Sequence, residues 1–163
     1  MNMEIVETQN IKPPPEYAGF WLRVAAYIID YFVLGFVLGI LVVFIGLAMG
    51  LSAAIFHDME DPANQVVIIT LSAILGITSV AASWLYYALL ESGSYQGTLG
   101  KMVLNLKVTD LEGERISFVR ATGRFFGKFL SSFIIYIGYI MIGFTEKQQG
   151  LHDILAGCLV VRK

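Results

Sequence analysis

The sequence predicts an all-α membrane protein with two long transmembrane helices, a third short spanning or re-entrant helical segment, and a small cytoplasmic pair of β-strands. Two observations support this prediction. Hydrophobic residues make up 56% of the 163 residues and charged residues 15%, and the mean hydropathy is +0.70, whereas about 25% of the residues in a soluble domain are charged. Residues 31–56 and 62–90 contain no Asp, Glu, Lys or Arg. Either run is long enough to cross a bilayer, which takes about 20 apolar residues.

The composition also limits the classes of function. It argues against a soluble globular enzyme, and the net charge of −2 with a pI of 5.6 argues against a nucleic-acid-binding module. The single cysteine, Cys158, cannot form an intrachain disulfide. Residues 1–10 carry acids where a secretory signal carries Lys or Arg, so we expect no cleavage.

The chain divides into a short arm and one membrane domain. Residues 1–18 are polar and contain three consecutive prolines, which favour an extended chain. We expect them to form a cytoplasmic arm, followed by a single domain over residues 19–163. The first transmembrane helix is predicted at about 20–51 and the second at about 64–90.

Charge asymmetry predicts the orientation in the membrane. Residues 91–128 carry six of the eleven Lys and Arg residues, whereas the acidic turn at 57–63 carries none. The positive-inside rule therefore places residues 91–128 and the amino terminus in the cytoplasm and the turn outside. Within residues 91–128, apolar and other residues alternate over 102–109, which predicts a β-strand. We expect this strand to pair with a terminal strand at 159–162.

An amphipathic helix is predicted at 117–128, because Arg120, Arg124 and Lys128 recur every four residues and form one basic stripe. The uncharged residues 129–145 follow it. Their length is at the lower limit for a span, and two glycines interrupt them. This segment either crosses the membrane as a third helix or enters and returns as a re-entrant hairpin.

The first transmembrane helix carries two charges on one face. Arg23 and Asp30 are seven residues apart, so they lie within about 20° of each other but about 10 Å apart along the axis. An Asp at a helix centre costs roughly 2.5–3.5 kcal/mol to insert. We therefore expect Asp30 either to serve an ion or proton or to form a structural ion pair. The expected pairs are Arg23 with Asp153, and Asp30 with Arg124 or Arg120.

The opposite face of this helix carries a stripe of small residues, namely Gly35, Gly39, Gly46 and Gly50. Small residues four apart allow close approach of membrane helices. The stripe either packs against the second helix or forms the face of a homodimer.

No arrangement typical of an active site occurs in the sequence. The two histidines, His57 and His152, lack metal-ligand spacing, and residues 97–101 lack the full pattern of a phosphate loop. We therefore expect no enzyme activity, no catalytic residues, no metal and no cofactor. The expected partners are the lipid bilayer, a small cation or proton, and a second copy of the chain, but no nucleic acid.

Several segments resemble the RDD family. The segment GFWLRVAAYIID at 19–30 is similar to the opening of that family, and LHDILAG at 151–157 is similar to its ending. The family takes its name from one Arg and two Asp residues, to which Arg23, Asp30 and Asp153 correspond. The resemblance implies a small multi-pass protein of the bacterial inner (plasma) membrane. It also implies a transport role, since cation/proton antiport has been suggested for some members.

Two hypotheses about function follow. In the first, the protein transports a small cation or proton with Asp30 as the membrane carboxylate. Three or four helices enclose little space, so this role would need an oligomer. In the second, it is a non-transporting membrane scaffold or accessory subunit. A structural network then holds it together, formed by Arg23, Asp30, Arg120, Arg124 and Asp153.

Overall fold

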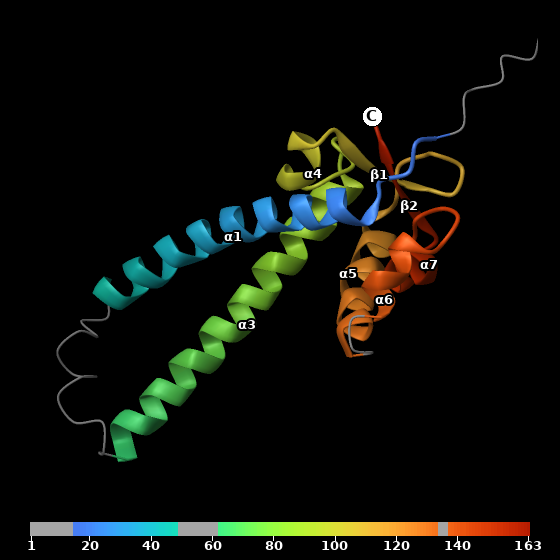
Figure 1. The fold of residues 1–163 in the computed structure, drawn as a ribbon. Coiled ribbons are helices and arrows are strands. Elements are labelled where there is room, and N and C mark those ends of the chain that lie inside the picture. Colours follow the sequence, from blue (N-terminus) through green and yellow to red (C-terminus); the bar gives the residue numbers. More distant parts are fainter. Residues whose placement is uncertain (1–14, 49–61, 134–136) are drawn as a thin grey trace, which may run out of the picture.

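The computed structural model describes residues 15–48, 62–133 and 137–163 (Figure 1). Within these ranges the chain is mostly helical and contains one two-stranded sheet. The predicted fold class is confirmed to that extent. Most of the predicted arm and the acidic residues of the predicted turn lie outside the described residues.

Two long helices dominate the fold. Helix α1 spans Phe20–Ala48 and helix α3 spans Pro62–Ser92. Their stretches Phe20–Phe44 and Asn64–Ser92 are each long and apolar enough to cross a membrane, and few of their residues are buried inside the protein. Large apolar side chains on the outside of a helix are stable where lipid, not water, surrounds it. Two transmembrane helices are therefore supported by both length and exposure.

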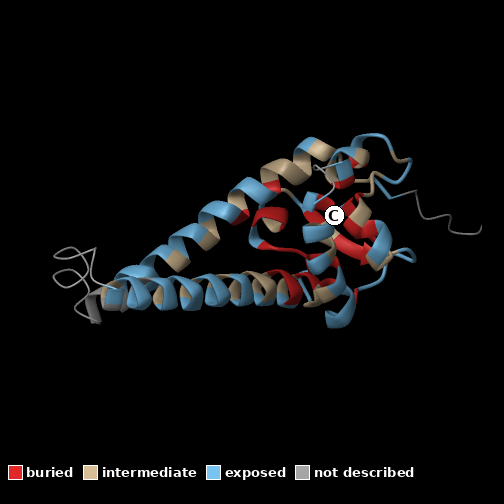
Figure 2. Ribbon diagram, turned by 90° about the horizontal axis from the view of Figure 1, so that it is seen from below, coloured by how far each residue is buried: buried red, intermediate tan, exposed pale blue. Residues whose placement is uncertain are grey.

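In Figure 1 the start of α1 overlaps the end of α3, but Figure 2 shows these two ends apart, with the buried core between them. A Cβ atom added at Gly35 or Gly39 would meet nothing within 4 Å. The expectation that the glycine stripe packs against the second helix is therefore wrong at these two positions. Gly46 lies in α1, but its surroundings are not among the described features, and Gly50 lies outside the described residues. The homodimer face stays a prediction.

The sheet forms between the two segments that the sequence analysis paired. Strand β1 spans Leu106–Asp110 and strand β2 spans Cys158–Arg162, and they run antiparallel with Leu106 opposite Arg162. The strand was predicted at 102–109, but it begins only at Leu106. Helix α4 spans Leu99–Val103, and the chain then turns at Asn105, which has a φ of 54°. Asn tolerates this left-handed conformation better than most residues, so a helix and a turn precede the strand.

The amphipathic helix is longer than predicted. Helix α5 spans Phe118–Phe133 and thus includes the beginning of the uncharged segment. Helix α6, Ile137–Ile140, and the 3₁₀ helix η1, Met141–Gly143, are bent by 118° from α5. A straight third helix over 129–145 therefore does not form, whereas a broken span and a re-entrant hairpin both fit the bend.

Close contact between α5 and α6 requires a glycine. A Cβ atom at Gly138 would lie 2.8 Å from the side chain of Ser131, which is closer than non-bonded carbon atoms approach. Helix α7, Leu151–Ala156, packs against α5 and leads into β2.

The buried core lies around the sheet, between the start of α1 and the end of α3 (Figure 2). The segment before α1 joins this core, since Ala18 N donates to Val160 O at 2.9 Å. The start of α1 is therefore fixed to the edge of β2. The core residues are Ala18, Ala26, Ala88, Leu106, Val108, Ile116, Ala121, Cys158 and Val160.

We predict that Gly100→Ala lowers the free energy of unfolding by about 1–3 kcal/mol or more, as overpacking commonly does. A Cβ atom at position 100 would lie 2.1 Å from the backbone oxygen of Ala26 in α1. Gly123→Ala is the matched control, because a Cβ there meets nothing within 4 Å and Ala favours a helix. Thermal melting in detergent compares the two variants. Equal melting temperatures would show that α4 does not contact α1 this closely.

Candidate functional site

Charged side chains from five elements meet between the start of α1 and the end of α3. Each is at least nine-tenths buried as a side chain. Such a concentration of buried charge is stable only when the charges pair with one another. The residues are Arg23 of α1, Glu91 of α3, Lys101 of α4, Arg124 of α5 and Asp153 of α7.

Arg124 is the central cation of this ionic network. Its Nε donates to Asp153 Oδ1 at 2.7 Å and its Nη1 to Glu91 Oε2 at 2.7 Å. The other oxygen of Glu91 accepts from Lys101 Nζ at 2.5 Å, and the other oxygen of Asp153 accepts from Arg23. Each carboxylate is therefore shared by two cations, and the five residues form one continuous chain of ion pairs.

Local structure orients both ends of the Arg23–Asp153 pair. Asp153 is the third residue of α7, and its Oδ2 also accepts from the backbone N of Gly150, which caps that helix, at 3.2 Å. A carboxylate is favoured in the first turn of a helix. Arg23 donates from Nε to Ala18 O at 2.8 Å and from Nη2 to Gln148 O at 2.5 Å. The pair therefore fixes the start of α1 to the start of α7.

The network keeps Asp153 ionised. Burial alone would raise the pKa of Asp153, but the Arg124 and Arg23 guanidiniums beside it hold that pKa well below its usual range. Burial lowers the pKa of Lys101, an effect that Arg124 increases and Glu91 opposes. Removal of one partner from such a buried pair typically costs about 3–5 kcal/mol.

Asp30 lies apart from the network. It is 1% exposed, and its Oδ1 accepts from Tyr86 Oη and from Gly100 N, each at 2.7 Å. Its Oδ2 accepts from Thr98 Oγ1 at 2.6 Å. Thr98 and Gly100 flank the start of α4, so Asp30 holds that short helix against α1 and α3.

The structure bears on each expected pair. Arg23 lies beside Asp153, as expected. The expected pairing of Asp30 with Arg124 or Arg120 is wrong, because hydroxyl and backbone donors surround Asp30. Arg124 binds two other carboxylates, and half-exposed Arg120 lies 3.6 Å from Asp110.

Sequence reasoning missed four participants: Glu91, Lys101, Tyr86 and Thr98. Glu91 was detectable, because it directly follows the charge-free run 62–90. A single carboxylate at the end of a membrane helix needs a partner, because an unpaired charge is costly there. The donors to Asp30 carried no comparable signal, since a Tyr and a Thr near a bilayer interface are common.

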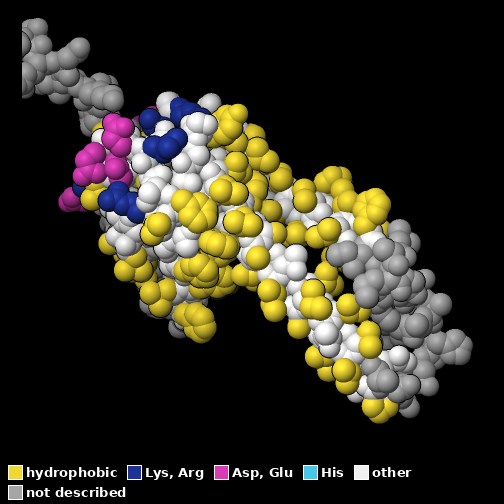
Figure 3. All heavy atoms as spheres, turned by 180° about the vertical axis from the view of Figure 1, so that it is seen from behind, with side chains coloured by type: hydrophobic (Ala, Val, Ile, Leu, Met, Phe, Trp, Pro, Cys, Tyr) yellow, Lys and Arg dark blue, Asp and Glu magenta, His cyan; other side chains and the backbone are white. Residues whose placement is uncertain are grey.

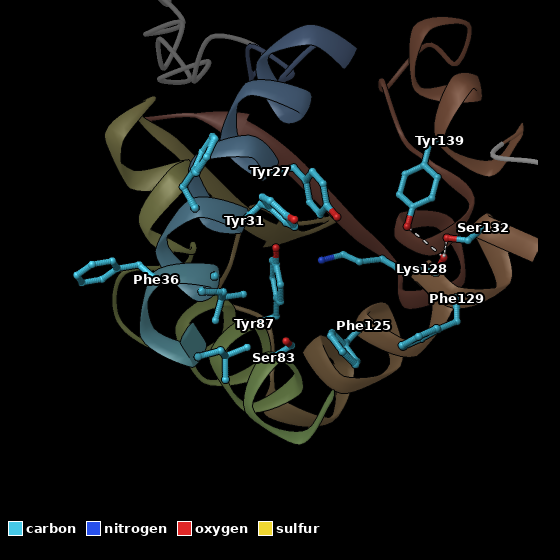
Figure 4. A pocket seen from close by; sticks show the side chains of 14 residues that line it. Tyr27, Tyr31, Phe36, Ser83, Tyr87, Phe125, Lys128, Phe129, Ser132 and Tyr139 are labelled. Atoms are coloured by element: carbon cyan, nitrogen blue, oxygen red, sulfur yellow. Dashed lines mark hydrogen bonds between the residues drawn. The ribbon is translucent and has the colours of Figure 1, made fainter. Parts of the chain in front are cut away.

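A cavity of about 410 Å³ adjoins the network. A second cavity of about 630 Å³ lies beside it, between α1, α3 and α5 (Figure 4). We call them the inner and outer cavities. The charged residues and the histidine that line the inner cavity are Arg23, Asp30, Lys101, Arg124, Lys128 and His152. The residues that line both cavities are Tyr27, Tyr87, Lys128, Ser132 and Tyr139.

His152 is a buried neutral side chain at the edge of the network. Its ring centroid lies 5.2 Å from that of Tyr139, and its Nδ1 lies 3.4 Å from Ser131 Oγ. Burial lowers the pKa of His152 to about 3, although Asp153 opposes the shift. Within the described ranges, no three His, Cys, Asp or Glu side chains are grouped so that they could hold a metal ion.

Comparisons with known proteins agree with the resemblance noted in the sequence. The RDD family model matches residues 17–157. Uncharacterized protein YxaI of Bacillus subtilis (strain 168) is 40% identical over 149 residues, which cover 90% of this chain and 97% of that protein. Uncharacterized membrane protein YteJ of the same organism is 30% identical over 173 residues, covering 98% of this chain and 94% of that protein. No solved structure matches the chain.

We predict that stability falls as the pH drops from about 6.5 toward 4.5 and that His152→Gln flattens this dependence. The folded pKa of His152 is about 3, against an ordinary value of 6.5. Below pH 6.5 the unfolded chain therefore binds a proton that the folded chain does not. The resulting slope is at most about 1.4 kcal/mol per pH unit. Denaturant unfolding in detergent across this window measures both slopes, and equal slopes would contradict the burial of a neutral His152.

Proposed function

Because the chain belongs to the RDD family, we propose that it is a non-enzymatic and non-transporting membrane scaffold or accessory subunit. In this proposal the ionic network is structural and fixes the membrane helices to the sheet and to α7. The proposed location is the bacterial plasma membrane, with the amino terminus and the sheet in the cytoplasm. The six Lys and Arg residues of 91–128 support that orientation.

One observation carries the proposal: all three residues that correspond to the family's name bind other parts of the chain. Arg23 binds Asp153 and two backbone oxygens. Asp153 binds two arginines and a backbone N–H. Both oxygens of Asp30 accept hydrogen bonds from the protein. A transported cation would have to displace these contacts.

The charges around the inner cavity also weigh against the passage of cations. Four cationic side chains line it, and Asp30 is the one carboxylate among the described lining residues. Glu91 and Asp153 lie behind the wall and neutralise part of this charge. Four cations then stand against three carboxylates, so one positive charge remains unbalanced. Such a surface raises the local concentration of anions and repels cations. The cationic lining residues are Arg23, Lys101, Arg124 and Lys128.

Transport of a small cation or proton, including cation/proton antiport, is the second candidate. It is favoured by the position of Asp30, which lies on the wall of a cavity between two helices long enough to cross a membrane. Ionisable residues at such places are common in proton and ion pathways. The described helices enclose little space, so this candidate needs an oligomer.

Reconstitution into liposomes distinguishes the two candidates. With a pH-sensitive dye inside and Na⁺ or K⁺ gradients imposed, we predict that flux equals that of protein-free liposomes. Flux above that level that Asp30→Asn abolishes would overturn the proposal in favour of transport.

The structural role predicts a second result with the same preparations. Arg23→Gln and Asp153→Asn should each lower the free energy of unfolding by about 3–5 kcal/mol, because each leaves a buried charge without its partner. Arg115→Gln is the matched control, since Arg115 is exposed. Network variants that melt at the temperature of this control would refute the structural role.

A further inference from the structure

Lys128 is a cation of the cavities that the ionic network does not use. It lies one turn after Arg124 in α5, and its Nζ is 3.8 Å from the centroid of the Tyr87 ring. Within the part of the chain that the structure describes, its ammonium forms no ion pair. A partly buried ammonium against an aromatic face gains some cation–π energy, but it lacks the anion that would compensate its desolvation.

Lys128 lies between the two neighbouring cavities. It lines both of them, together with Tyr27, Tyr87, Ser132 and Tyr139. Figure 4 shows its ammonium pointing into the space between Tyr27 and Tyr31 of α1 and Tyr87 of α3. A ligand that touches Lys128 can therefore extend into both the charged inner cavity and the outer cavity.

The outer cavity is apolar and faces the membrane helices. Hydrophobic side chains cover the long helices, whereas the visible Lys, Arg, Asp and Glu side chains gather at the end that carries the sheet (Figure 3). The outer cavity is lined by the membrane-spanning stretches of α1 and α3 together with α5 and Tyr139, which are the surroundings expected for a lipid chain. Its apolar lining includes Phe32, Leu34, Phe36, Leu38, Phe125 and Phe129.

We propose that the two neighbouring cavities bind one anionic phospholipid, with its phosphate at Lys128 and an acyl chain in the outer cavity. The unpaired cation selects an anion, because Lys128 is the charge by which the cations of the inner cavity exceed the carboxylates beside them. The apolar outer cavity selects a hydrocarbon chain, which a free phosphate lacks. The outer cavity alone falls within the range of about 300–1,000 Å³ that is usual for small-molecule sites. This site is independent of the proposed scaffold role.

The headgroup contact is tested with the purified full chain in a neutral detergent. Phosphatidylglycerol, phosphatidylcholine or inorganic phosphate is added, and melting temperature and native mass spectrometry report binding. We expect phosphatidylglycerol to raise the melting temperature and to stay bound at one molecule per chain, with much weaker effects of the other two. Lys128→Gln should weaken phosphatidylglycerol binding roughly tenfold, the usual effect of losing one charge-assisted hydrogen bond. Lys128→Arg should retain most of it.

The control for the charge is Lys147→Gln, which removes an exposed lysine that does not line either cavity. It should bind phosphatidylglycerol as the parent does. Melting of each variant without lipid shows whether it is folded, so a loss of binding is not mistaken for a loss of structure.

The hydrocarbon contact is tested by filling the outer cavity. Gly35 lines that cavity and Gly39 does not, yet an added Cβ meets nothing within 4 Å at either position. Gly35→Leu should weaken phosphatidylglycerol binding by several fold, whereas the matched Gly39→Leu should not.

Four results would overturn the proposal. The first is equal binding of phosphatidylglycerol and phosphatidylcholine, and the second is unchanged binding by Lys128→Gln. The third is inorganic phosphate binding as tightly as phosphatidylglycerol, which would assign the site to a free anion. The fourth is a lipid-free dimer in native mass spectrometry that Gly35→Leu disrupts, which would assign the outer cavity to a second copy of the chain.

Discussion

Arg124 lies buried between two carboxylates that are far apart in the sequence. Glu91 belongs to the end of a membrane helix, and Asp153 belongs to a short helix before the last strand. The guanidinium of Arg124 has N–H donors that point in fixed, different directions, so it can bind both carboxylates at once. A lysine ammonium lacks this fixed geometry. Loss of Arg124 would leave two buried carboxylates with one cation each. The mutual position of α3, α5 and α7 therefore depends on this side chain.

The same constraint positions the membrane helices. Within the described residues, ion pairs and the hydrogen bonds of Asp30 hold the first half of α1 to α7, α4 and the end of α3. Along the rest of their length, large exposed side chains on both helices favour contact with lipid as much as with each other. The outer cavity lies between α1, α3 and α5, and Lys128 is part of its lining. The end of the domain that contains the ionic network thus anchors the helices and also borders the space in which a ligand can bind.

The elements that depend on local pattern were predictable from the sequence, and so were two long-range contacts, the pairing of the strands and that of Arg23 with Asp153. The contacts of Asp30 and of Arg124 were not. Charge-free runs located both long helices, and the spacing of Arg23 and Asp30 indicated that each needs a partner outside α1. The alternation at 102–109 was misleading over its first residues, because a short helix against α1 and a turn at Asn105 replaced the start of the strand. The partners of Asp30 were unpredictable, because backbone and hydroxyl donors replace the cation that electrostatics alone would favour.

A double-mutant cycle between Glu91→Gln and Arg124→Gln tests the central role of Arg124 most directly. The free energies of unfolding of the parent, both single variants and the double variant are measured in one detergent. If the two side chains form a buried pair, their effects are coupled by about 0.5–3 kcal/mol, and the double variant is more stable than the sum of the single losses predicts. Strictly additive losses would contradict the account, because they would mean that Arg124 does not hold α3 through Glu91.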